Sequence, residues 1–543
     1  MSDHADTPQP ESAAEGASNP VEHELSPEEQ LALEEELVQF AAKESTRLGL
    51  GREQYVENVA DQFWAEERPH TTILVSGLSM AHDHLVTAAL SGIGYKVATL
   101  DVPDQESLRF GKEFGNRGQC SPTYFTVGNL VKELVHMRDV QGKSTQEIVD
   151  SYIFLTAGGC GPCRFGMYVT EYRKALRDAG FDGFRVMTFQ MAGGIQQATG
   201  KELGLRIDPE FAWHIVRALI VGDILNILGY RMRPYEVVEG STDKALEACK
   251  ALLFNTFSKK QHVSLALWKC RRILKKVQID RTKPKPLVSI IGEFFAMTTE
   301  GDGNYHMHRF LEGEGAEVEI QGITNWLLFL IWEAGYDTAR RQDLRWDDIA
   351  RKGLEGKDAT KKQWSLRAGY WAIRAVFQSY ANILGLHSYE LPDMHHIAEL
   401  AKAHYNPDVR GGEAHMEVGK LIHFVEDNIN HMTVSVKPFG CMPSSGVSDG
   451  VQSLVQALYP KAIFVPIETT GDQAVNAHSR VQMMLFKARQ KANSEFEKAL
   501  SETGLSQEEF SRRVKKSRWW RHPFTRPKHK TASVVTNLVY QVS

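Results

Sequence analysis

Short apolar runs alternate with helical stretches along most of the chain, and this alternation predicts the fold. The runs that resemble buried strands fall at residues 71–76, 95–100, 153–156, 184–189, 287–291, 316–320, 432–438 and 462–467. Between them, apolar residues recur at helical spacing, as at Tyr168, Tyr172 and Leu176. Strands that alternate with helices indicate parallel sheets joined by right-handed crossovers. We therefore predict an α/β fold with two parallel-sheet domains and helical insertions.

Changes in composition divide the chain into predicted parts. The first residues are rich in Pro, Ser, Ala and Glu, which is typical of a disordered acidic tail. The run RTKPKP predicts a linker, because the strand pattern restarts directly after it. The predicted parts are a tail (1–25), N-terminal helices (26–70), a first α/β domain with a helical extension (71–280), a second with a helical insertion (287–490), and a helix with a basic tail (491–543). The charges of that last tail predict a solvated segment, with docking to an acidic partner or to nucleic acid as the alternative.

Candidate chemistry lies in loops that contain glycine or proline and precede helices. Four cysteines occupy such loops: Cys120, Cys160, Cys163 and Cys441. Backbone N–H groups at a helix N-terminus favour the thiolate, which is both a nucleophile and a metal ligand. A buried cysteine can also be only a small hydrophobe, but glycine and proline are poor neighbours for a core residue. Cys249 and Cys270 lie within helical patterns, where the core interpretation is preferred.

Loops of this kind meet at the carboxyl ends of the strands in doubly wound sheets. Four thiolates that converge there suit an iron–sulfur cluster or zinc. The pair Cys160 and Cys163 alone would also suit a thiol–disulfide oxidoreductase. A metal that only holds two domains together, in a non-catalytic scaffold, is a third hypothesis. Six histidines between His395 and His431 form no H-E-x-x-H motif, and most are expected to be surface or hydrogen-bonded residues.

Composition adds little about partners. The chain is 42% hydrophobic and 24% charged, and its formal net charge of −5 indicates neither nucleic acid nor a membrane surface. The polar N-terminus lacks the pattern of a signal peptide, so we expect a cytoplasmic protein with its cysteines as thiols or metal ligands. The longest apolar stretch, 211–230, contains His214, Arg217 and Asp223, which predicts a core helix rather than a membrane span.

Several motifs together resemble one protein family. They are HTTILVSGLSMAHD, CSPTYFTVGN, GPCRFGMY, VSIIGEFF with GNYHMHRFLEGEGAEV, GGEAHMEVGK, and FGCMP with IETTGDQAVN. They span about residues 70–485, and GPCRFG-x-Y is the most specific of them. The chain resembles the iron–sulfur modules of the 2-hydroxyacyl-CoA dehydratase superfamily, in particular those associated with the activator of (R)-2-hydroxyglutaryl-CoA dehydratase.

The resemblance implies two Rossmann-like domains around a cysteine-bound cluster in the cleft between them. The implied ligands are Cys120, Cys163 and Cys441, with Cys160 as a fourth, and the implied cofactor is a 4Fe-4S cluster or a double cubane. Dehydratases of this superfamily use a low-potential electron to remove water from a 2-hydroxyacyl-CoA thioester. Their subunits use three cysteines and leave one iron open to substrate, whereas a fourth ligand here would favour electron transfer alone. No residue of this chain is assigned to an acyl-CoA.

Electron delivery in this superfamily is coupled to ATP hydrolysis, and an ATP site usually contains a glycine-rich phosphate-binding loop. The run GIQQATGK at 194–201 has the wrong spacing for a P-loop, and Glu202 stands where Ser or Thr is required. The loop GGCGPCRFG does not match G-x-G-x-x-G either. We therefore predict a separate activator ATPase as the partner.

Overall fold

The computed structural model describes residues 27–47, 62–158, 163–189, 204–341, 358–387, 389–409, 414–444 and 450–543. The chain divides into two compact units, residues 1–59 and residues 60–543. Helix α1 (Pro27–Arg47) belongs to the first unit, and its apolar Leu37, Val38 and Phe40 are exposed. The predicted tail at 1–25 lies outside the described residues.

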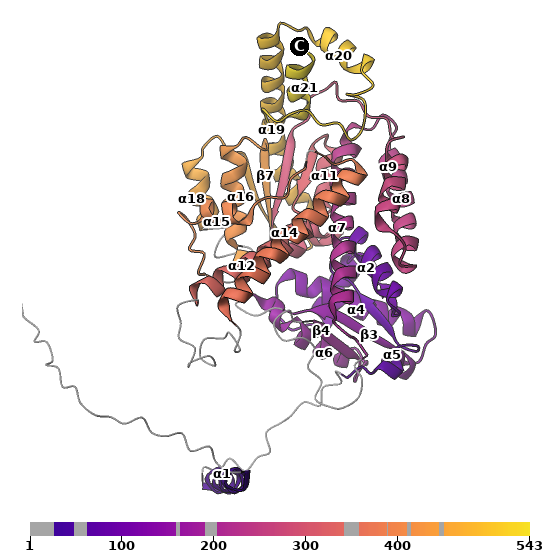
Figure 1. The fold of residues 1–543 in the computed structure, drawn as a ribbon, viewed down its shortest axis with the longest axis vertical. Coiled ribbons are helices and arrows are strands. Elements are labelled where there is room, and N and C mark those ends of the chain that lie inside the picture. The colour runs from indigo at the N-terminus through magenta and orange to yellow at the C-terminus, as the bar shows by residue number, and fades with distance from the viewer. Residues whose placement is uncertain are drawn as a thin grey trace, which may run out of the picture. The chain divides into compact units, whose positions relative to one another are not determined.

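The second unit contains two four-stranded sheets, and every strand pairing in them is parallel (Figure 1). The first sheet has the order β2 (Lys96–Thr99), β1 (Thr72–Val75), β3 (Tyr152–Ala157), β4 (Arg185–Phe189). The second has the order β6 (Glu317–Ile320), β5 (Leu287–Gly292), β7 (Met432–Pro438), β8 (Phe464–Thr469). Both sheets therefore follow one plan, and the predicted α/β fold with two Rossmann-like sheets is confirmed.

Helices flank each sheet because their apolar stripes must be buried against it. Those of the first sheet are α2 (Met80–Gly92), α3 (Gln105–Phe114), α4 (Ser121–Asp139), α5 (Thr145–Ser151) and α6 (Tyr168–Asp178). Those around the second include α10 (Phe294–Thr298), α11 (Met307–Gly313), α15 (Met394–Ala401), α16 (Ala414–Glu426), α17 (Met442–Ser444) and α18 (Val451–Leu458). Leu130, Phe154 and Leu176 are buried in the core that α4 and α6 form with the first sheet.

A helical layer connects the two sheets. It consists of α7 (Pro209–Met232), α8 (Ser241–Ser258), α9 (Val263–Leu274), α12 (Ile323–Arg340) and α14 (Ala359–Leu384). Helix α7 packs against α2 on one side and β6 on the other. It is the one helix of the described residues that is long and apolar enough to cross a membrane, and 67% of its apolar window is buried inside the fold. That burial is typical of a core helix, as predicted.

The C-terminal part packs onto the second sheet instead of forming the solvated tail that its charge predicts. It contains α19 (Ala474–Thr503), α20 (Gln507–Lys516) and α21 (Val534–Val542). Arg281 of the predicted linker is buried and donates to the carbonyls of Thr525 at 2.6 Å and Pro523 at 3.0 Å. Arg526 pairs with the buried Glu317 at 2.7 Å. The basic residues of this segment are therefore partly structural.

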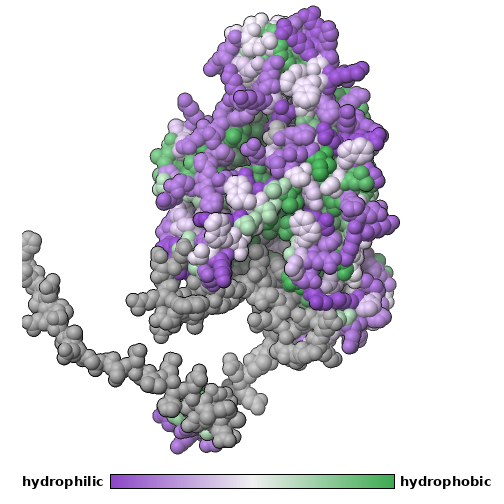
Figure 2. Space-filling model, viewed as in Figure 1, coloured by the Kyte–Doolittle hydropathy of each residue, from purple (hydrophilic) through white to green (hydrophobic). Residues whose placement is uncertain are grey.

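The visible surface of the second unit is largely hydrophilic with scattered hydrophobic patches, and a pale strip runs along α14 (Figure 2). Ala368, Trp371, Ala372 and Ala375 are exposed on this helix. Trp371 and Trp364 are each 66% exposed, and each lies near an arginine guanidinium. Single exposed apolar residues are normal in folded proteins, so this strip is not by itself a site.

Candidate functional site

Cys120 is the N-cap residue of α4, and its thiol is enclosed by hydroxyl groups. The side chain is 5% exposed. Its Sγ atom lies 3.1 Å from the Tyr168 hydroxyl and 3.2 Å from the Thr123 hydroxyl. Pro122 lies in the first turn of α4, where its missing N–H costs nothing. The helix therefore begins directly after Cys120, with the N-terminal end of α4 beside the sulfur.

Cys441 comes from the second sheet and lies beside Cys120. It follows β7 through Gly440, whose φ of +74° is in the left-handed region that favours glycine. A Cβ atom at Gly440 would lie 3.3 Å from the Cα atom of Cys120, so the two loops are in direct contact. The Ser121 N–H donates to the Phe439 carbonyl at 3.0 Å, and the Ser121 hydroxyl donates to the Thr469 carbonyl at 2.7 Å. Backbone contacts thus hold together two cysteine loops that are far apart in the sequence.

Cys163 lies in a third loop, next to that of Cys120. It is the half-buried N-cap residue of η2 (Arg164–Met167) and follows β3 in the chain. The Arg164 guanidinium donates to the Gly118 carbonyl, in the loop that precedes Cys120. Tyr168, which begins the next helix, reaches the Cys120 sulfur. Cys160 lies outside the described residues.

A carboxyl group that the sequence analysis missed also lies at this junction. Glu293 directly follows β5, caps α10 by accepting the Ala296 N–H at 2.9 Å, and is half-buried. Burial raises the pKa of the Glu293 carboxyl above its usual range. Its position after the apolar strand run at 287–291 is the signal that would have found it, since groups at strand carboxyl ends meet in this fold.

Burial dominates the electrostatics of the cysteines as well. Burial raises the pKa of the Cys441 thiol, and the nearby Glu293 carboxyl and Cys120 thiol raise it further. The pKa of the Tyr168 hydroxyl lies well above its usual value because it is buried and lies beside Cys120. The protein alone therefore favours neutral groups here. A bound cation would reverse this preference, since coordination deprotonates a thiol.

Cys249 and Cys270 lie away from these loops, in α8 and α9. They are both 0% exposed and belong to the core of the helical layer. Each sulfur contacts the backbone carbonyl of the other cysteine, at 3.8 and 3.9 Å. The pair provides matched control positions for work on the other cysteines.

A second buried group of side chains was also not predicted from the sequence. It links a hydroxyl, an imidazole and a carboxylate in the order of a nucleophile, a base and an acid. The Ser79 hydroxyl lies 2.6 Å from His82 Nδ1, and His82 Nε2 lies 3.0 Å from Asp223 Oδ1. All three side chains are 3% exposed or less. Asp223 also caps α12 by accepting the Thr324 N–H at 2.7 Å. With no access to solvent and a carboxylate committed to a helix cap, this group is structural.

The described residues contain one group of potential metal ligands that includes histidines, namely His396, His423 and Asp427 on α15 and at the end of α16. Their ligand atoms all lie within 4.8 Å of one another. His423 Nδ1 is already 2.7 Å from Asp427 Oδ2. Both His396 and Asp427 are exposed, so the group resembles a surface ion pair with a neighbouring imidazole more than an enclosed metal site.

Neither comparison with known proteins provides a relative. No protein-family model matches the chain, and no curated protein matches it in sequence.

Proposed function

We propose that this chain is a cytoplasmic iron–sulfur protein of the 2-hydroxyacyl-CoA dehydratase and activator superfamily, which carries low-potential electrons. Its cluster would be bound by Cys120, Cys163 and Cys441, with Cys160 as a fourth ligand. The observation that supports this most is the contact between the Cys120 and Cys441 loops, which come from different sheets. A core cysteine pair has no need of such an arrangement, whereas a cluster needs converging ligands.

The residues at the junction fit such a group. Thiolates are the usual ligands of iron–sulfur clusters, and a 4Fe-4S cluster takes four of them. Cys120 and Cys163 are N-cap residues, and Cys441 directly precedes the short helix α17. The backbone N–H groups at these helix starts favour negative charge nearby. When bound, a cluster of this kind supplies one-electron transfer at a potential that its surroundings adjust.

The neighbouring side chains suggest how the protein would adjust that potential. The Tyr168 hydroxyl can donate to the Cys120 sulfur, and hydrogen bonds to ligand sulfurs change the reduction potential. Burial raises the pKa of the Glu293 carboxyl, which favours its neutral form beside the site. The loops of both sheets limit the access of water to Cys120 and Cys441. Each of these groups belongs to the chain itself and can be substituted.

The proposed electron donor is a separate ATP-hydrolysing activator, and the proposed acceptor is an acyl-CoA or a protein that acts on one. This part of the proposal rests on the family resemblance and on the sequence of 194–201, which lacks the spacing of a P-loop.

The test is anaerobic purification followed by assays of iron, acid-labile sulfide and zinc. We expect about four iron and four sulfide per chain for a single cubane, and about twice as much iron for a double cubane. Stoichiometric zinc without sulfide would contradict the proposal. A dithiol enzyme would instead keep its activity in Cys120→Ser and Cys441→Ser and lose it in Cys163→Ser. A metal-held scaffold would unfold on chelation and show no reversible redox change.

A further inference from the structure

A pocket of about 410 Å³ lies at the end of the second sheet that is opposite to Cys441 along the strands. It is formed by the segment 280–286, the turn before β6, η3 (Arg233–Tyr235) and α19. Pro286 directly precedes β5, so the pocket borders the amino ends of the strands. Cys441 and Glu293 follow the carboxyl ends of β7 and β5. The pocket is therefore separate from the cysteine site.

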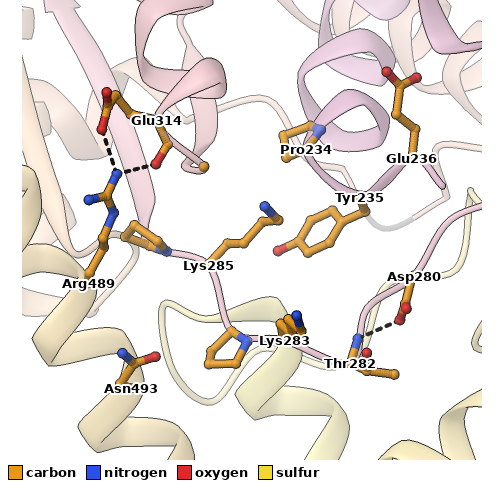
Figure 3. A pocket seen from close by; sticks show the side chains of 13 residues that line it. Pro234, Tyr235, Glu236, Asp280, Thr282, Lys283, Lys285, Glu314, Arg489 and Asn493 are labelled. Carbon is orange, nitrogen blue, oxygen red and sulfur yellow. Dashed lines mark hydrogen bonds and ion pairs between the residues drawn. The ribbon is translucent and has the colours of Figure 1, made fainter. Parts of the chain in front are cut away.

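Three cationic side chains line the pocket: Lys283, Lys285 and Arg489 (Figure 3). Arg489 is already engaged, because it donates to the Glu314 carboxylate at 2.8 Å and to the Glu314 carbonyl. The Lys285 ammonium lies 5.9 Å from the centre of the Tyr235 ring. Neither lysine forms an ion pair with any residue that the structure describes. Two ammonium groups in this pocket thus lie outside the ion pairs that the described residues form.

The other acidic groups of the lining form no ion pair with these lysines and are hydrogen-bonded to backbone N–H groups instead. The Glu236 carboxylate accepts the N–H groups of Gly240 and Thr242, both at 2.7 Å. The Asp280 carboxylate accepts the Thr282 N–H at 3.0 Å. These hydrogen bonds fix the two carboxylates at the start of α8 and at the segment after Asp280.

These surroundings change the pKa of Lys285, whose side chain is half-buried. Burial lowers the pKa of its ammonium; Glu317 opposes this change, and the positive charges of Lys283 and Arg489 add to it. An ammonium in such surroundings gains from an anion, which replaces lost hydration and offsets the repulsion between the cations.

We propose that this pocket binds a phosphate ester, with the phosphate between Lys283 and Lys285 and the organic part against Tyr235. Lysine binds phosphate as a point charge, and a dianion can satisfy two lysines at once. The rings of Tyr235, Pro234 and Pro284 form an apolar wall. The volume exceeds what an inorganic phosphate would fill. Proline fixes the backbone, so little ordering is required on binding.

The experiment measures the binding of phenyl phosphate to the full-length protein by calorimetry and by the shift of the thermal midpoint. Inorganic phosphate and phenol are the comparison ligands, and sodium sulfate at equal ionic strength controls for screening. We expect phenyl phosphate to bind more tightly than inorganic phosphate, and phenol not to bind. Binding should weaken with added salt. Equal stabilisation by sulfate and phenyl phosphate would overturn the proposal, as would the absence of any binding.

Substitution locates the site. Lys283→Gln and Lys285→Gln should each weaken phenyl phosphate about tenfold, as expected for one lost charge-assisted hydrogen bond. Lys276→Gln, an exposed lysine just after α9 and outside the lining, is the matched control and should bind normally. Because Lys283 is exposed, its variant should fold even if Lys285→Gln does not. Unchanged affinity in Lys283→Gln would overturn the assignment. The measurement does not depend on iron content, so its outcome is independent of the proposed cluster.

Discussion

Asp223 offers the sharpest test of how the two sheets are held together. Its carboxylate is 2% exposed and accepts from His82 Nε2 at 3.0 Å, from the Ile323 N–H at 2.8 Å and from the Thr324 N–H at 2.7 Å. One side chain on α7 thus joins the start of α2 to the start of α12. A Cβ atom at Gly322 would lie 2.7 Å from the carboxylate carbon, so the close approach requires glycine there. The Thr324 hydroxyl also donates to this carboxylate, at 2.5 Å, so the substitution Asp223→Ala removes the acceptor for four donors.

The expected loss of stability follows from these contacts. A buried donor left without an acceptor costs about 1–3 kcal/mol, and the four donors affected include the first backbone groups of α12. Partial relaxation and entry of water reduce the sum, so we expect Asp223→Ala to lower the free energy of unfolding by about 4–6 kcal/mol. Asp208 is the matched control. It caps α7 through the Phe211 N–H at 2.8 Å but is exposed, so Asp208→Ala should cost about 1 kcal/mol.

The assay is urea unfolding followed by tryptophan fluorescence and circular dichroism, with the midpoints compared among the parent and both variants. Gly322→Ala tests the same contact from the other side, because it leaves Asp223 in place and disturbs only the approach of α12. Its midpoint should also fall below that of Asp208→Ala. If Asp223→Ala and Asp208→Ala shift the midpoint equally, the buried carboxylate does not connect the sheets as described.

The remaining predictions concern pH, the cysteines and ATP. Burial raises the pKa of Asp83 to about 7, so the folded chain holds a proton that the unfolded chain releases near pH 4. Stability should therefore fall by about 4 kcal/mol as the pH rises from 4 to 7, and urea midpoints across this range should show Asp83→Asn without that loss. Cys441→Ser should lower bound iron at least several-fold in anaerobic iron assays, whereas Cys270→Ala should keep it; equal iron in both would contradict the assignment. The purified chain should neither bind nor hydrolyse ATP in equilibrium dialysis and phosphate-release assays, and turnover would reveal a nucleotide site that the sequence search missed.

Much of the fold follows from the apolar pattern. The run at 432–438 predicts a strand with the same bounds as β7, and the other strands lie within two residues of their predicted ends. This agreement has a physical reason, since strands of a parallel sheet are buried on both faces and need continuous apolar runs. The start of a helix directly after Cys120 can be predicted as well, because the residues that signal a helix start, such as Pro122, are local in the sequence.

What the sequence does not reveal are contacts between residues far apart in the chain. Glu293 and Asp223 look like ordinary acidic residues until the sheets assemble and place them beside buried partners. The basic residues near the C-terminus look solvated because charge pattern alone does not show that Arg526 meets Glu317. The tertiary fold decides which charges are buried, and that information is distributed over the whole chain.

The hydrogen bonds of the buried Arg281 guanidinium affect how the chain can fold during its synthesis. This guanidinium is buried, and the carbonyls that bind it belong to residues 522–525, which lie 241 to 244 positions further along the chain and are therefore synthesised later. The Glu317 carboxylate likewise forms its ion pair only after Arg526 has been synthesised. Until then, burial of these two side chains leaves the Arg281 guanidinium without its carbonyl acceptors and Glu317 with the Tyr235 hydroxyl but without its cation, which destabilises the assembled second sheet. A growing chain that has not yet reached residues 522–526 therefore differs from the folded protein by a guanidinium and a carboxylate that lack these buried partners.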